Sequence, residues 1–132
     1  MKEFTIVYDK ITNEIATDIL IESALNPIER IKAKAIWDTG SVATMITPNM
    51  AKRLNLECVS YTTINSITDL NIPTKIYMVY LYLPNNLKID TFVNEAKPID
   101  CDILIGMDII SRGRFFIDNK NGKTKFAFKL RT

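Results

Sequence analysis

The 132-residue chain contains no histidine. This absence excludes Ser-His and Cys-His nucleophilic sites and every zinc site that uses a histidine ligand. The two cysteines, Cys58 and Cys101, are too few for a four-cysteine metal site, so we expect neither a metal nor an organic cofactor. If the chain is a hydrolase, its carboxylates are the groups left to carry the reaction.

The chain also lacks a large excess of charge of one sign and lacks long apolar runs. The net charge is +2, and the Lys and Arg residues are scattered, whereas a nucleic-acid partner would require a basic stripe. No segment approaches the roughly 20 apolar residues that cross a bilayer, so no membrane association is expected. The first residues lead into a strand-like pattern and do not resemble a signal peptide. We therefore expect a cytoplasmic protein whose cysteines are reduced, buried thiols.

Alternating apolar and polar residues, many of them β-branched, predict a mostly β protein. The chain has the length of one domain, residues 1–132, without linkers or repeats. Thr47-Pro48 predicts the start of a helix that ends near Leu54, and Asn121-Gly122 favours a type I′ turn. A helical turn is predicted over 107–111, and strands are predicted over 4–8, 14–22, 31–37, 61–67, 76–83, 103–105, 115–118 and 124–130.

The tetrapeptide Asp38-Thr39-Gly40-Ser41 places an acid at the exit of an apolar strand. These residue types are common in surface turns. A solvent-exposed turn, however, rarely lies between two apolar stretches, which here are Ala35–Trp37 and Val42–Ile46. A carboxylate in such a place needs hydrogen-bond donors, and the two hydroxyls and the glycine N–H of the tetrapeptide can supply them.

Asp38-Thr39-Gly40-Ser41 resembles the active-site signature of aspartic proteases. In the single-domain, retropepsin-like branch, a second signature follows: an apolar pair, a glycine and a short helix. Residues 103–110 are similar to it, with Gly106 as the glycine, and a hairpin-like stretch separates the two signatures. The tail from Gly113 to Phe128 is similar to bacterial members of the branch. The resemblance covers the chain from about residue 14 to its end.

The resemblance implies a closed acid-protease barrel with one short helix near residues 48–54 and one lobe per chain. In this family two aspartates share one proton and activate a water that attacks a peptide bond. Because Asp-Thr-Gly occurs once here, the second aspartate would come from another copy related by a two-fold axis. The partners implied are a second copy and a polypeptide substrate. The chain ends, Phe4–Val7 and Phe126–Leu130, are expected to contribute strands to the dimer interface.

The resemblance also assigns roles to single residues. Asp38 would be the catalytic acid and base, and Thr39 would hydrogen-bond across the dimer axis. Gly40 would offer its N–H to the carboxylate, and Ser41 could donate its hydroxyl to the ionised carboxylate. Gly106 would fit beneath the active-site loop. For Asp108, which follows it, we expect a structural role.

The hairpin over about 61–83 corresponds to the flap that closes over substrate, with Thr68, Asp69 and Leu70 at its substrate-binding tip. Flaps of viral members are rich in glycine, but this chain has four glycines and none in that hairpin. The chain is therefore predicted to be an aspartic endopeptidase, and the glycine-poor flap favours the alternative, a non-catalytic retropepsin-fold module for dimerisation or peptide binding. A third possibility, an aspartyl phosphoryl-transfer site, lacks further acidic residues close to Asp38 in the sequence.

Overall fold

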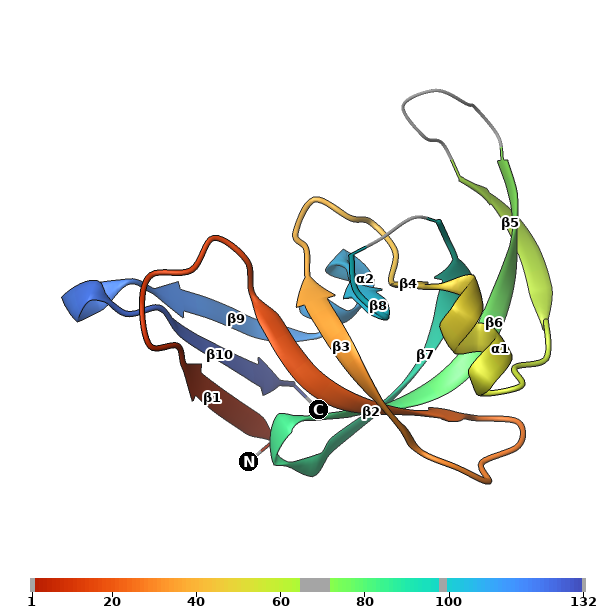
Figure 1. The fold of residues 1–132 in the computed structure, drawn as a ribbon, viewed down its shortest axis with the longest axis horizontal. Helices are drawn as coiled ribbons and strands as arrows, with labels where there is room; N and C mark the ends of the chain where they lie inside the picture. The colour runs from red at the N-terminus through yellow and green to blue at the C-terminus, as the bar shows by residue number, and fades with distance from the viewer. Residues whose placement is uncertain (1, 65–71, 98–99, 132) are drawn as a thin grey trace.

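The computed structural model describes residues 2–64, 72–97 and 100–131 (Figure 1). Strands make up most of its regular structure, together with two short α-helices and two 3₁₀ turns. The helices are α1 (Pro48–Arg53) and α2 (Met107–Ile110), and the 3₁₀ turns are η1 (Pro84–Asn86) and η2 (Lys120–Gly122). The strands are β1 (Glu3–Val7), β2 (Ala16–Ser23), β3 (Ile31–Trp37), β4 (Met45–Ile46), β5 (Ser60–Ile64), β6 (Ile72–Leu83), β7 (Leu87–Glu95), β8 (Ile103–Ile105), β9 (Gly113–Asp118) and β10 (Lys125–Leu130).

Six of the strands form a closed barrel in the order β2-β3-β8-β4-β7-β6, and β6 pairs again with β2. Closure leaves none of these strands as a free edge. β3 runs parallel to β8, with Trp37 opposite Ile105, and β4 lies between β8 and β7. The predicted fold class, a mostly β closed barrel, is confirmed.

The predicted start of the first helix is confirmed in its details. Thr47 caps α1 by accepting a hydrogen bond from the Met50 N–H at 3.2 Å, Pro48 is the first helical residue, and Leu54 is the C-cap. The predicted helical turn after Gly106 is α2. Asn121 and Gly122 have φ angles of 61° and 72°, the left-handed backbone that a type I′ turn requires.

The strand β7 was missing from the sequence prediction, which assigned no element between the strands predicted over 76–83 and 103–105. Its residues nevertheless alternate between the barrel interior and the outside. Every second side chain from Leu87 to Val93 is buried, and those between are exposed. Leu87 follows η1 directly. β6 and β7 therefore form a long antiparallel hairpin that pairs from Leu83↔Leu87 to Ile76↔Asn94.

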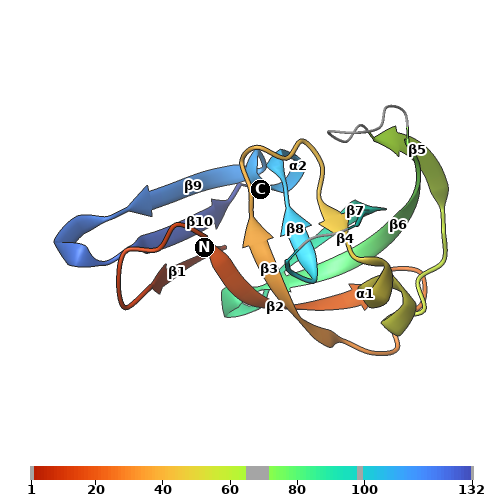
Figure 2. The ribbon, with the colours of Figure 1, turned by 45° about the horizontal axis from the view of Figure 1, so that its top comes forward.

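A separate three-stranded antiparallel sheet, in the order β1-β10-β9, lies beside the barrel (Figures 1 and 2). The ends of the chain therefore pair with each other within one copy, with Phe4 opposite Phe128. An aromatic cluster joins this sheet to the end of β3. Trp37 packs against Phe126, Phe128, Phe115 and Phe4 with ring centroids 5.1, 5.2, 6.2 and 6.0 Å away.

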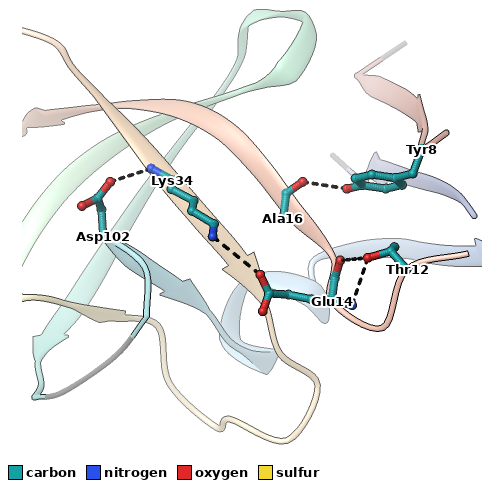
Figure 3. Close-up of polar contacts among 6 residues, drawn as sticks. All are labelled: Tyr8, Thr12, Glu14, Ala16, Lys34 and Asp102. Atoms are coloured by element: carbon teal, nitrogen blue, oxygen red, sulfur yellow. Dashed lines mark hydrogen bonds and ion pairs between the residues drawn. The ribbon is translucent and has the colours of Figure 1, made fainter. Parts of the chain in front are cut away.

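Polar contacts fix β3 and the segments beside it (Figure 3). The Lys34 N–H donates to the Asp102 carboxylate at 2.7 Å, and the Asp102 N–H donates back to the Lys34 carbonyl at 3.0 Å. The Lys34 ammonium also lies 3.7 Å from Glu14. The Tyr8 hydroxyl donates to the Ala16 carbonyl at 2.7 Å, which ties the end of β1 to the start of β2. β3 is thereby held against β8 on one side and β2 on the other.

Cys58 and Cys101 are unpaired thiols, and both are half-buried, where the sequence predicted buried ones. Burial raises the pKa of the Cys101 thiol above its ordinary value. Within the described ranges, the helices are too short to span a membrane.

Candidate active site

Asp38 lies directly after β3, where the chain leaves the barrel. Its N–H donates to the Ile105 carbonyl at 2.8 Å, which extends the pairing of β3 with β8 by one residue. The preceding Trp37 is buried, and its indole N–H donates to the Thr17 hydroxyl at 2.9 Å. The Asp38 side chain is half-buried, so a firmly held strand presents a carboxylate at the surface of the protein.

The loop after Asp38 turns back on the carboxylate. The Gly40 N–H donates to Asp38 Oδ1 at 2.8 Å, and the Ser41 N–H donates to the Asp38 carbonyl at 3.2 Å. A Cβ atom on Gly40 would lie 3.1 Å from Oδ1, closer than most such contacts, so a glycine suits this approach. Thr39 and Gly40 are exposed, and Asp38 forms no ion pair with any residue that the structure describes.

Ser41 differs from its expected role. Its hydroxyl donates to the Ala43 carbonyl at 2.8 Å and not to the Asp38 carboxylate. A hydroxyl has a single hydrogen to donate, and the turn brings this half-buried carbonyl within its reach. The Ser41 side chain therefore stabilises the loop by binding the loop's own backbone at Ala43.

Gly106 lies beneath the loop and against its backbone. A Cβ atom there would stand 2.7 Å from the Ala43 carbonyl oxygen and 2.8 Å from that of Ser41. The first N–H groups of α2 also serve this loop: that of Met107 donates to the Ser41 carbonyl at 2.8 Å, and that of Asp108 to the Val42 carbonyl at 3.2 Å. The beginning of α2 thus finds in the loop the acceptors that a helix start lacks within itself.

Thr44 was not singled out from the sequence, yet it joins the loop to both β8 and α2. Its side chain is fully buried, and its hydroxyl donates to Asp108 Oδ1 at 2.7 Å and accepts from the Gly106 N–H at 3.1 Å. Asp108 Oδ2 accepts from the Thr44 N–H at 3.0 Å. Asp108 is therefore engaged in holding the loop, as a structural role requires. The sequence signal for this role was a hydroxyl residue, Thr44, within the largely apolar segment Val42–Ile46.

The predicted flap hairpin consists of β5 and the first part of β6, paired from Ser60↔Ile76 to Ile64↔Ile72. Its base is anchored to the end of β7, because the Thr74 hydroxyl donates to the Glu95 carbonyl and the Tyr77 hydroxyl donates to the Glu95 carboxylate at 3.0 Å. Burial, and then the hydrogen bond to Glu95, raise the pKa of Tyr77 above its ordinary value. The predicted tip residues Thr68, Asp69 and Leu70 lie outside the described residues.

The structure thus brings Asp38, Gly40, Ser41 and Gly106 together in one unit, although the two signatures lie far apart in the chain. The unit offers one carboxylate with one oxygen held by an N–H. Over residues 2–64, 72–97 and 100–131, no three His, Cys, Asp or Glu side chains gather as a metal site would require. Proton transfer through a carboxylate is the chemistry that these residues can perform.

Comparison with solved structures shows which fold this is. The chain superimposes on a retropepsin-like aspartic protease from Rickettsia conorii with a TM-score of 0.59 and 12% sequence identity, covering 96% of this chain and 92% of that one. It also superimposes on EIAV protease complexed with the inhibitor HBY-793, with a TM-score of 0.52 and 19% identity, covering 79% of this chain and 90% of that one. No protein-family model and no curated protein sequence matches the chain.

These similarities confirm that the fold is that of the retropepsin-like aspartic proteases. At identities below one fifth, they show the fold and do not extend to activity. A chain of this class forms one lobe, and the described residues contain one Asp-Thr-Gly loop.

Proposed function

We propose that this chain is an aspartic endopeptidase whose active site forms between two copies. The observation that carries the proposal is the geometry of Asp38. Its half-buried carboxylate directly follows the barrel strand β3, and one of its oxygens is held by the Gly40 N–H at 2.8 Å. A loop braced by Gly106 and Asp108 keeps it in place.

The reaction follows from bringing two such carboxylates together. Two negative charges at short range repel each other, so a facing pair retains one proton between them. The ionised carboxylate accepts a proton from a water molecule as that water attacks the substrate carbonyl carbon. The protonated carboxyl donates its hydrogen to the carbonyl oxygen, and a proton then passes to the leaving amine. Asp38 of each copy would supply one of the two groups.

The neighbouring residues are suited to such an arrangement. Thr39 is exposed beside Asp38, so its hydroxyl is free to reach a second loop across a two-fold axis. The Gly40 N–H orients the carboxylate. The hairpin of β5 and β6 projects beyond the barrel and is anchored at its base by Glu95 (Figure 1). In the proposed enzyme, this hairpin covers an extended peptide.

The direct test is Asp38→Asn, assayed against a peptide library with wild type in parallel. We expect activity below about 1% of wild type, since an essential acid–base group typically contributes roughly 10²-fold or more. Asp90→Asn makes the same chemical change at an exposed carboxylate on β7 and should leave activity intact. Circular dichroism and sedimentation should be unchanged for both variants. Peptide cleavage that survives Asp38→Asn, or a wild-type chain that binds peptides without cleaving any, would refute the proposal.

A further inference from the structure

The lysines and arginines, scattered elsewhere in the sequence, are concentrated at its C-terminal end. Residues 111–132 contain seven of them and one aspartate, a net charge of +6, in a chain whose total charge is +2. The rest of the chain therefore carries a net charge of −4. Most of the basic segment forms β9 and β10, so the small three-stranded sheet is the basic part of the molecule.

The strand register places three rows of side chains on the outer face of this sheet, the face turned away from the aromatic cluster around Trp37. Side chains directly opposite each other on neighbouring strands share a face. Phe126 and Phe128 point inward and are fully buried, so the residues between them on β10 point outward. The three outer rows are Glu3, Lys129 and Arg114, then Thr5, Ala127 and Phe116, then Val7, Lys125 and Asp118.

This outer face contains a hollow of about 290 Å³. Ala127 forms its floor, because it has the smallest side chain in the middle row, and Thr5 and Phe116 stand on either side. Lys125 and Lys129 lie at the two ends of the hollow along β10. Pockets for whole small molecules are typically larger, about 300–1,000 Å³, so this hollow is suited to a single apolar side chain.

The cations around the hollow are not neutralised within the chain. Arg114 and Lys129 lie directly opposite each other, an arrangement of like charges that destabilises a sheet. Glu3 lies on the other side of Lys129, yet none of Arg114, Lys125 and Lys129 forms an ion pair with any described residue. All three side chains are exposed. A bound anion would relieve the repulsion, so the charges of this face favour an acidic partner.

We propose that the outer face of the small sheet docks an acidic, extended segment of another polypeptide. The segment has two carboxylates four residues apart and an apolar side chain midway between them. Residues four apart in an extended chain share a face and lie about 13–14 Å apart. Lys125 and Lys129 have the same spacing on β10, so each meets one carboxylate, and the apolar side chain enters the hollow over Ala127. Arg114 adds a second cation beside Lys129.

The same face carries two carboxylates that disfavour a nucleic acid. Glu3 lies beside Lys129, and Asp118 lies beside Lys125, at opposite corners of the face. A nucleic-acid strand has a negative charge at every phosphate and would have to pass these carboxylates. A peptide can place its charges at the lysines alone and an apolar group at the hollow. An acidic polypeptide segment is therefore the partner that this face fits.

Docking on this face leaves the candidate active site open. The inner face of the sheet packs against Trp37, which directly precedes Asp38, and the hollow lies on the opposite face. Binding of the segment therefore does not depend on the proposed function. In the proposed enzyme, the face would hold a protein by a segment remote from the bond that is cleaved.

Fluorescence anisotropy of a labelled peptide tests the docking site. The peptide has two glutamates four positions apart, a leucine midway and serines elsewhere, and the control peptide has the same composition with adjacent glutamates and a terminal leucine. The full-length Asp38→Asn chain is used, so that no peptide is cleaved during the measurement. We expect saturable binding, weakened by salt and about tenfold tighter than that of the control, which loses one ion pair and the apolar contact. Equal affinities, or no saturation at millimolar peptide, would overturn the proposal.

Variants of the face test the separate contacts. Lys125→Gln and Lys129→Gln should each weaken binding about threefold, as the loss of an exposed ion pair typically does. Lys52→Gln, the same change at an exposed lysine on α1, should leave binding unchanged. Ala127→Leu changes no charge but fills the hollow, and it should weaken binding about fivefold by excluding the apolar side chain. A loss in the lysine variants without a loss in Ala127→Leu would indicate diffuse attraction and contradict the proposed site.

A single-stranded oligothymidylate serves as the competitor. If it binds more tightly than the patterned peptide and also requires Lys125 and Lys129, the face belongs to a nucleic acid and the proposal is wrong. The docking site and the proposed function fail separately. Saturable peptide binding by a chain whose wild type cleaves nothing would remove the proposed function alone. Cleavage that depends on Asp38, in a chain without saturable binding, would remove the docking site alone.

Discussion

Gly106 lies against the Ala43 carbonyl so closely that a Cβ atom would stand 2.7 Å from its oxygen and 2.8 Å from that of Ser41. Both contacts are with backbone, which cannot swing aside as a side chain can. The position of the loop that carries Asp38 therefore depends on Gly106 having no side chain. A single added methyl group at Gly106 would displace the loop.

Gly106→Ala should accordingly reduce kcat/KM for peptide cleavage by at least tenfold, because small displacements of a catalytic group cost up to about 10²-fold. The unfolding free energy should also fall, by about 1–3 kcal/mol, as overpacking typically causes. The control is Gly122→Asn, where no atom lies within 4 Å of an added Cβ and asparagine tolerates the φ of +72°. Equal activities for the two variants would show that the loop does not depend on this contact.

Thr44→Val should destabilise the protein without changing its shape. The buried Gly106 N–H loses its acceptor, and Asp108 Oδ1 keeps the Ile109 N–H but loses the Thr44 hydroxyl as a donor. Leaving a buried N–H without a partner costs about 1–3 kcal/mol. Thr44→Ser keeps the hydroxyl and removes a methyl group, so it serves as the control. Urea unfolding followed by circular dichroism should give a lower midpoint for the valine variant than for the serine variant. The reverse order would contradict the role of the hydroxyl.

Ser41→Ala should leave the acid limb of the pH profile of kcat/KM in place. The Ser41 hydrogen is donated to the Ala43 carbonyl at 2.8 Å, so its removal takes no donor from the Asp38 carboxylate. The loss should appear instead as about 0.5–1.5 kcal/mol of unfolding free energy. The measurement is kcat/KM against pH on one soluble peptide, beside urea unfolding. A shift of the acid limb would show that the Ser41 hydroxyl donates to the Asp38 carboxylate, as the sequence first predicted.

The specific activity of the intact chain should fall on dilution, because one copy contains one Asp38. Sedimentation over the same concentrations should show the dimer dissociating as activity disappears. Constant specific activity down to concentrations at which only monomer sediments would refute the two-copy site.

A truncation of residues 126–132 is not a suitable route to a monomer. Phe126 and Phe128 are fully buried in the aromatic cluster, and removing a single buried phenylalanine side chain costs about 3–5 kcal/mol. The loss of both approaches the whole stability of a small protein, about 5–15 kcal/mol. We expect the truncated chain to unfold, which circular dichroism would report directly.

Features that depend on neighbours in the chain could be predicted from the sequence alone. The Asp38-Thr39-Gly40-Ser41 signature, the strand over 31–37 and the Thr47 cap all arise from residues a few positions apart. Backbone preferences and capping act over that range, so local patterns were sufficient. The strand β7 also has a local pattern of alternating apolar and polar residues, which is sufficient to predict a strand there.

Other features required the tertiary structure, because their partners lie far away in the sequence. Thr44 and Asp108 are 64 positions apart, and no local pattern indicates that the hydroxyl of one meets the carboxylate of the other. The acceptor of the Ser41 hydroxyl depended on how the loop turns. The pairing of β1 with β10 within one copy was decided when distant strands packed around Trp37. The sequence by itself determined which residue carries the carboxylate, and the packing of distant segments decided what holds it.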